Sequence, residues 1–161
     1  MTVIRTPDPE DIAQMRHCAI TIWKSLMDEL PMAWVNQSIQ WIQTRDMNAL
    51  VPTESSTHIC FVADDVGTIV GLIEGNTHHW GVNHLTFIGV DSHHRRHGIG
   101  SQLFQRYLDE VAQRGIHKIR LSTLPTLHAA IRIYFKHGFI PEGYLRQEAH
   151  GMDVIIYSKF L

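Results

Sequence analysis

Two patterns of hydrophobic residues divide the chain. Apolar residues recur every three or four positions where a helix is expected, and they alternate or run continuously where a strand is expected. The helical pattern covers 12–26, a stretch around 35–47, 99–111 and 127–137. The strand pattern covers 3–5, 58–63, 68–74, 84–90, 118–122, 140–146 and 153–158. We therefore predict the order β-α-α-β-β-β-α-β-α-β-β, an α/β fold with a mixed sheet and helices on its faces.

Local signals set the expected ends of these elements. Asp8-Pro9-Glu10-Asp11 is typical of a helix start, because a capping residue precedes a proline and two acids. Asn36 is the expected cap of the second helix. Gly115 and Gly138 are expected to end the last two helices. The polar, histidine-rich stretch 76–83 is predicted to be a loop.

Composition narrows the class of protein. The 161 residues are 44% hydrophobic and carry a formal charge of −2, so we expect one globular domain over 1–161 and no broadly basic nucleic-acid surface. No apolar run approaches the roughly 20 residues of a membrane span, and no leader peptide is visible, so we expect a cytoplasmic protein. Cys18 and Cys60 lie in separate apolar segments and are predicted to be buried free thiols.

The 12 histidines are unusual, and several are grouped. His78, His84, His93, His94 and His97 have spacings that a metal ion could use, but no cysteine joins them. We therefore expect polar loops and no metal site.

The segment richest in chemical signals joins the strand ending at Val90 to the helix that follows. Arg95 and Arg96 precede Gly98 and Gly100, where that helix starts. Free backbone N–H groups at a helix start, glycines that permit close approach and two fixed positive charges together favour a phosphate or pyrophosphate. The P-loop pattern is absent, and the dinucleotide-binding glycine pattern is incomplete.

This segment resembles the acetyl-coenzyme A loop of the GNAT N-acetyltransferases, in which Arg/Gln-x-x-Gly-x-Gly/Ala follows a strand ending in Val. Arg95, Gly98 and Gly100 fill that pattern. A second match is the segment 130–139, a helix with Tyr134 followed by Gly138-Phe139. The resemblance covers about 58–161 and implies the GNAT fold, with a mostly antiparallel central sheet.

The resemblance implies a function: transfer of an acetyl group from acetyl-CoA to a primary amine, with both substrates bound together and no metal. Tyr134 would lie near the coenzyme sulfur and act as the general acid toward the departing thiolate. Val90 would pair with the pantetheine arm through its backbone. The residues implied to bind the coenzyme are Ile88, Val90, Arg95, Arg96, His97, Gly98, Ile99, Gly100, Ser101 and Tyr134.

The sequence departs from the family pattern in two places. Leu127 stands where many members have an Asn that contacts the coenzyme. No acid occurs in 84–90, where many members carry a Glu that deprotonates the amine. Glu74, at the end of the neighbouring strand, is our first candidate for the general base, followed by His84 and His79.

The amine acceptor is a small molecule or a peptide, and neither the sequence nor the resemblance separates the two. Trp34 and Trp41 lie where the family forms the acceptor side of its cleft. The acids that could attract an amine or lie near the acceptor entrance are Asp28, Glu29, Asp46, Glu148 and Asp153, with His150 among them. The resemblance also makes a homodimer plausible.

Two other functions remain open at this point. The missing strand acid and Leu127 are consistent with a non-catalytic domain that binds acyl-CoA as a sensor or scaffold. The glycine turn alone is consistent with a nucleotide-binding domain of another fold, although its incomplete pattern disfavours this.

Overall fold

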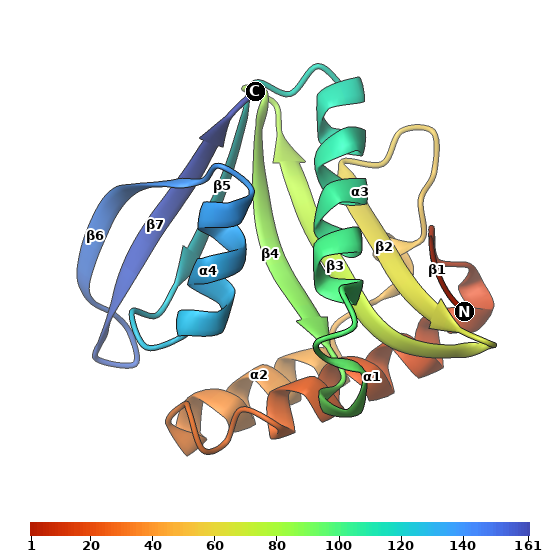
Figure 1. Ribbon diagram of the computed structural model, residues 1–161, viewed down its shortest axis with the longest axis horizontal. Helices are drawn as coiled ribbons and strands as arrows, with labels where there is room; N and C mark the ends of the chain where they lie inside the picture. The colour runs from red at the N-terminus through yellow and green to blue at the C-terminus, as the bar shows by residue number, and fades with distance from the viewer.

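The computed structural model describes residues 1–161 as a seven-stranded sheet with helices on both faces (Figure 1). The main helices are α1 (Ile12–Lys24), α2 (Met32–Thr44), α3 (Ile99–Gln113) and α4 (His128–Lys136). The strands are β1 (Thr2–Arg5), β2 (His58–Asp65), β3 (Thr68–His78), β4 (Val82–Val90), β5 (Lys118–Thr123), β6 (Ile140–Ala149) and β7 (Met152–Phe160). Short 3-10 turns cover Pro9–Asp11, Asn48–Leu50 and Ser92–His94. The predicted order of helices and strands is confirmed.

The strands lie in the order β1-β2-β3-β4-β5-β7-β6. All neighbouring pairs are antiparallel except β4 and β5, which are parallel. The expectation of a mixed, mostly antiparallel sheet flanked by helices is therefore confirmed. No helix is long and apolar enough to cross a membrane.

Alternation along the central strands sends apolar side chains to two separate cores. Phe61 and Ile73 face α3 and α4, in a cluster that also contains Phe104. Cys60 and Leu72 face α1 on the opposite side of the sheet. Because successive residues of a strand point to opposite faces, the near-continuous apolar runs of β2 and β3 are those of strands covered on both sides.

The pairing of β4 with β5 stops soon after it begins. The two strands are in register only at Val82–Lys118, Asn83–Ile119 and His84–Arg120. Beyond that point they separate, as Figure 1 shows. A register shift between Glu74 and Gly75 marks a bulge in the β3–β4 ladder, which skips Thr86. Bulges bend a strand, so this one helps to turn β4 away from β5 and open the sheet.

A buried polar contact fixes the sheet next to this bulge. The hydroxyl of Tyr107, on α3, donates a hydrogen bond of 2.6 Å to the side-chain oxygen of Asn83. Gly75 leaves room for that hydroxyl, because a Cβ at this position would collide with it. The glycine therefore allows α3 to lie close to the sheet where the strands begin to separate.

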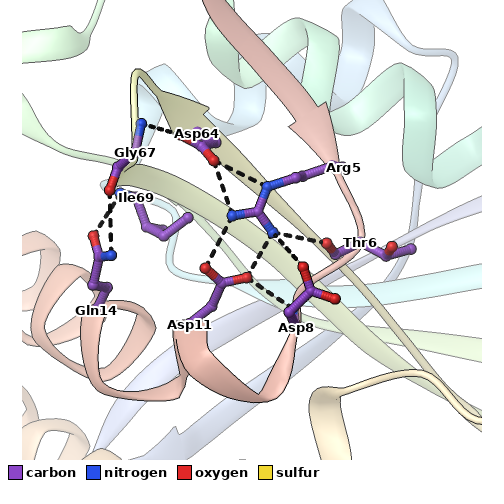
Figure 2. A network of polar contacts seen from close by, with 8 residues as sticks. All are labelled: Arg5, Thr6, Asp8, Asp11, Gln14, Asp64, Gly67 and Ile69. Carbon is purple, nitrogen blue, oxygen red and sulfur yellow. Dashed lines mark hydrogen bonds and ion pairs between the residues drawn. The ribbon is translucent and has the colours of Figure 1, made fainter.

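A network of charges ties the edge strand β1 to the start of α1 (Figure 2). The Arg5 guanidinium donates to both oxygens of Asp11, at 2.6 and 2.9 Å, and to Asp64 of β2 at 2.9 and 3.0 Å. The Asp8 backbone N–H also donates to Asp11, at 2.8 Å. Hydrogen bonding from Arg5 is the main cause that lowers the pKa of Asp11. The predicted helix start at residues 8–11 is thus confirmed, with a 3-10 turn leading into α1.

Two predictions of local structure were wrong. Helix α2 begins at Met32, after Pro31, and not at Asn36. Residues 76–83 are not an open loop, since β3 and β4 extend to His78 and from Val82 and leave a tight hairpin turn. Backbone pairing does not depend on side-chain polarity, so polar residues at the tip of a hairpin can still form a ladder. Cys18 and Cys60 are free and buried, as predicted.

Candidate active site

A cavity of about 940 Å³ lies where β4 and β5 separate. Residues from α1, α2, β4, the turn after β4, the start of α3, β5, α4 and the β6–β7 hairpin line it. This volume is at the upper end of the roughly 300–1,000 Å³ of small-molecule sites, and most of the lining side chains are hydrophobic. Two parts of the lining differ in construction, and we name them the amide loop and the tryptophan wall.

The amide loop is the segment Arg95–Ser101, which connects β4 to α3. None of its backbone N–H groups donates a hydrogen bond within the protein; the first bonded amide is that of Gln102, which donates to Gly98 at 3.0 Å. Arg96 and Gly98 have φ values of 65° and 81°, in the left-handed region. A run of free amides at the start of a helix is a site for an anion, because the helix dipole adds positive charge there.

The two arginines of the amide loop have different roles. Arg95 donates from Nε to the Val90 carbonyl at 3.0 Å and from a terminal nitrogen, at 2.6 Å, to Oγ of Ser25, the residue that follows α1. Arg95 therefore holds the amide loop against the end of α1. Arg96 lines the cavity, is exposed and has no ion pair or hydrogen bond within the protein, so its charge is available to a ligand.

The residues that were predicted to bind the coenzyme do not all line the cavity. Nearly all of them line the cavity: Ile88, Val90, Arg95, Arg96, Gly98, Ile99, Gly100, Ser101 and Tyr134. His97 does not, and its ring lies 3.3 Å from the His94 carbonyl. The Val90 carbonyl accepts one hydrogen bond within the protein, from Arg95 Nε at 3.0 Å, and a carbonyl oxygen has a second lone pair.

Tyr134 lies in the cavity wall on α4. Its side chain is 7% exposed and packs against Phe104, Phe139 and Tyr157, with ring centroids about 6 Å away. Burial raises the pKa of Tyr134 to about 12, while a hydrogen bond from Thr123 acts in the opposite direction. The phenol is therefore neutral at physiological pH and holds a proton that it can donate.

Glu74 lies outside the cavity. Its carboxylate is 5% exposed and accepts two hydrogen bonds from Arg45, at 2.8 and 2.6 Å. Both oxygens are therefore occupied, and the position does not favour the predicted role as general base.

His84 is the only one of the three candidate bases that lines the cavity; His79 is in the hairpin turn, against Trp80. Burial lowers the pKa of His84, and the positive charge of Arg120 lowers it further. Arg120 is the register partner of His84 on β5. The imidazole is thus neutral at pH 7 and able to accept a proton.

The tryptophan wall consists of Trp23, Leu26, Leu30, Trp34 and Trp41, from α1, α2 and the turn between them. Three of the four tryptophans of the chain lie in it, and only Trp80 does not. Trp23 packs on Phe87 of β4, with ring centroids 6.1 Å apart, and Trp34 lies 5.9 Å from the ring of His150. The expectation that Trp34 and Trp41 face the cleft agrees with their place in the cavity.

The other acids and histidines singled out from the sequence fall into two groups. Glu29 and Glu148 line the cavity and are exposed, whereas Asp28, Asp46 and Asp153 do not line it. No group of three histidine, cysteine, aspartate or glutamate residues lies close enough to hold a metal ion. Leu127 lines the cavity in the place where the family pattern has an Asn.

Sequence reasoning missed three residues that shape the site: Ser25, Arg45 and Arg120. Ser25 bonds to Arg95, 70 positions away, and Arg45 bonds to Glu74, 29 positions away. No local sequence pattern predicts such pairs. The alternation of β5, which places Arg120 on the face opposite Leu121, could have indicated that Arg120 shares a face with His84.

Comparison with known proteins agrees with this geometry. The model of the acetyltransferase (GNAT) family matches residues 21–139, and the chain therefore belongs to this family of acetyltransferases. A search of curated protein sequences finds no significant match.

Several solved structures share the fold. The PaiA N-acetyltransferase of Thermoplasma acidophilum, solved with coenzyme A, aligns with a TM-score of 0.82 at 20% identity, over 100% of this chain and 99% of that one. A GNAT acetyltransferase of Streptococcus pneumoniae aligns with a TM-score of 0.77 at 20% identity, over 100% and 99%. The ribosomal-protein-S18-alanine N-acetyltransferase of Escherichia coli aligns with a TM-score of 0.73 at 19% identity, over 98% and 92%.

Proposed function

We propose that this acetyltransferase moves the acetyl group of acetyl-CoA to a primary amine while both substrates occupy the cavity. The observation that carries the proposal is the amide loop, whose free N–H groups border the same cavity as Tyr134. The amides and the free Arg96 fit a pyrophosphate. The hydrophobic part of the lining fits the pantetheine arm, and the volume leaves room for an acceptor beside it.

In the proposed reaction the amine nitrogen forms a bond to the acetyl carbon, and the bond from that carbon to sulfur breaks. Tyr134 protonates the departing thiolate. Its pKa of about 12 is high for an acid at neutral pH. The apolar surroundings that stabilise the neutral phenol also disfavour a thiolate, so the transfer is less uphill than the pKa of the phenol alone implies. Holding both substrates in one cavity supplies further rate.

A primary amine is an ammonium ion at neutral pH and has no free electron pair, so it must lose a proton before this bond can form. We propose that His84 accepts it, in place of Glu74. His84 borders the cavity and is neutral at pH 7, whereas both oxygens of Glu74 are held by Arg45. Arg120 beside His84 favours the neutral imidazole, which leaves the ring free to take a proton but also makes it a weaker base.

The proposal is tested by binding and turnover on the same protein. We expect acetyl-CoA to bind in an isothermal titration while NAD does not, and Arg96→Ala to weaken acetyl-CoA binding about tenfold without lowering the melting temperature. We expect release of free coenzyme thiol only when an amine is added. Acetyl-CoA binding with no thiol release for any amine would favour a non-catalytic acyl-CoA-binding domain. Absence of acetyl-CoA binding would overturn the proposal.

A further inference from the structure

Trp41 is a large aromatic residue left open to the cavity. Its side chain is 54% exposed, although it belongs to a helix whose opposite side is buried through Val35 and Ile42. An open tryptophan that borders a mostly hydrophobic cavity is typical of a surface that a ligand covers.

One face of the Trp41 ring is already occupied. The guanidinium carbon of Arg45 lies 4.2 Å from the ring centroid. Arg45 also ends helix α2, where its backbone N–H donates to the Trp41 carbonyl at 2.9 Å. The exposed part of the indole is therefore the part that Arg45 does not cover.

Glu74 holds the arginine in this position. Its two oxygens accept from the two terminal nitrogens of Arg45, an arrangement that fixes the plane of the guanidinium. Glu74 is itself buried in β3 beside the bulge, and its carbonyl accepts a hydrogen bond of 3.1 Å from Thr86 of β4. A rigid path of contacts thus runs from the opened sheet through Glu74 and Arg45 to Trp41.

The charges around the tryptophan wall indicate what kind of amine fits. Outside the amide loop, the charged groups that line the cavity are Glu29 and Glu148, both exposed, and Arg120. A polycation would need several carboxylates close together, and Arg120 would repel it. A single ammonium group on an apolar body matches this lining better.

We propose that the tryptophan wall binds a primary amine carried on a flat aromatic ring, and that Glu74 and Arg45 are positioning residues that hold Trp41 for it. The ring of the acceptor would stack on the open part of the indole, while a short arm would bring the amine toward His84 and Tyr134. This inference rests on the proposed function and names the acceptor class for the same cavity.

Three amines test the acceptor class. 2-Phenylethylamine and 2-cyclohexylethylamine have the same charge and carbon skeleton, but only the first has a flat ring. Spermidine represents polycations. We expect kcat/KM for 2-phenylethylamine to exceed that for 2-cyclohexylethylamine about threefold to tenfold, and that for spermidine by more. Equal values for the two ring amines, or a preference for spermidine, would overturn the proposal.

Variants test the path of contacts. Trp41→Ala is expected to abolish the preference for the aromatic amine, and Trp80→Ala, which removes a 75% exposed tryptophan outside the cavity, is the matched control and should preserve it. Arg45→Lys keeps a positive charge that can pair with Glu74 but has no planar guanidinium to stack on Trp41. We expect it to raise KM for 2-phenylethylamine about threefold, with kcat and the KM for acetyl-CoA unchanged. No change in Arg45→Lys would overturn the positioning role.

Equilibrium binding separates failure of this inference from failure of the proposed function. 2-Phenylethylamine is titrated calorimetrically into protein saturated with coenzyme A, which carries no acetyl group. Binding that is lost in Trp41→Ala supports the wall even if no turnover is found, in which case only the proposed function fails. Turnover of other amines without such binding overturns the wall and leaves the proposed function intact.

Discussion

The amide loop and the tryptophan wall border one cavity but present different parts of the chain to a ligand. The loop offers backbone N–H groups from consecutive residues, Arg95–Ser101. The wall offers side chains from two helices and the turn between them, and one of these, Trp41, contacts Arg45, which pairs with Glu74 of β3. Backbone groups are the same in any sequence that keeps the turn, whereas side chains change with every substitution. We conclude that the amide loop is fixed by local geometry and the tryptophan wall by residue identity.

The largest effect is expected at Tyr134, which lines the cavity from α4 and belongs to neither part. Tyr134→Phe removes the proposed acid but keeps the ring, so we expect kcat to fall by about 10²–10⁴ while the Kd for acetyl-CoA stays the same. Tyr157→Phe is the matched control, since Tyr157 packs in the same cluster but does not line the cavity. Steady-state kinetics and titration of both variants measure this. An unchanged kcat in Tyr134→Phe would remove the residue from the mechanism.

The ion pair behind the wall tests whether Glu74 is structural or catalytic. Glu74→Gln leaves the Arg45 charge partly buried without its partner, so we expect unfolding free energy to fall by about 3–5 kcal/mol in denaturant titration. Replacing both residues by leucine is expected to recover most of that loss.

The double leucine variant also gives the decisive kinetic result. If Glu74 only positions the wall, this variant still acetylates 2-cyclohexylethylamine at close to the wild-type kcat, because that amine does not need the aromatic stack. A drop of a hundredfold or more in a stable double variant would instead show that the ion pair does more than position the wall.

Gly100 offers a change confined to the loop side. A Cβ there would make only ordinary contacts, 3.8 Å from a Val90 methyl and 3.9 Å from an Ile133 methyl, and both of those residues line the cavity. The Cβ of Gly100→Leu is therefore accommodated, and we expect the rest of the leucine side chain to fill space that the proposed coenzyme needs; thermal melting checks that the variant is folded. We expect the Kd for acetyl-CoA to rise about tenfold to a hundredfold, as measured by titration. Trp41→Ala should leave that Kd unchanged, and a shared effect would contradict the separation of the two parts.

The smallest expected effect is on stability against pH. Burial lowers the pKa of His84 and of His137, whose ring stacks on Phe104 with centroids 4.7 Å apart. The unfolded chain therefore binds more protons than the folded one once pH falls below about 6.5. We expect stability to decline from pH 7 toward pH 5, and His137→Phe to flatten the slope while keeping the stack. Denaturant titrations across this range measure the free energy of unfolding at each pH. If His137→Phe shows the same dependence on pH as the wild type, His137 is excluded as a contributor.

The sequence was sufficient for the order of elements and for the amide loop, because both depend on local patterns. Periodicity located every strand, and the spacing of Arg95, Gly98 and Gly100 marked the helix start that carries the free amides. The same patterns gave no sign that Arg95 is held by Ser25, since that bond joins residues 70 positions apart.

The acceptor side could be predicted only in outline. Trp34 and Trp41 were identified by their place in the chain, but the ion pair that Glu74 makes with Arg45 joins it to another element. A carboxylate at a strand end has the same sequence signature whether it faces solvent, substrate or an arginine. The pairing that decides between these roles exists only after the sheet and α2 have packed together.

The short parallel pairing of β4 with β5 has a consequence for how the molecule opens. Residues 1–113 supply β1–β4 and their helices, and residues 118–160 supply β5, α4, β6 and β7, so the two half-sheets are contiguous pieces of chain. Between them the ladder holds only at Val82–Lys118, Asn83–Ile119 and His84–Arg120. The seam between the half-sheets is thus the expected boundary of two cooperative units. Two apolar clusters also cross it, one where α4 packs with Phe104 and one where Leu30 and Val35 pack with Leu124 and Val154. A ligand that contacts both half-sheets would stabilise the state in which they are packed together. Slower amide hydrogen exchange in both half-sheets would therefore report that the cavity is occupied.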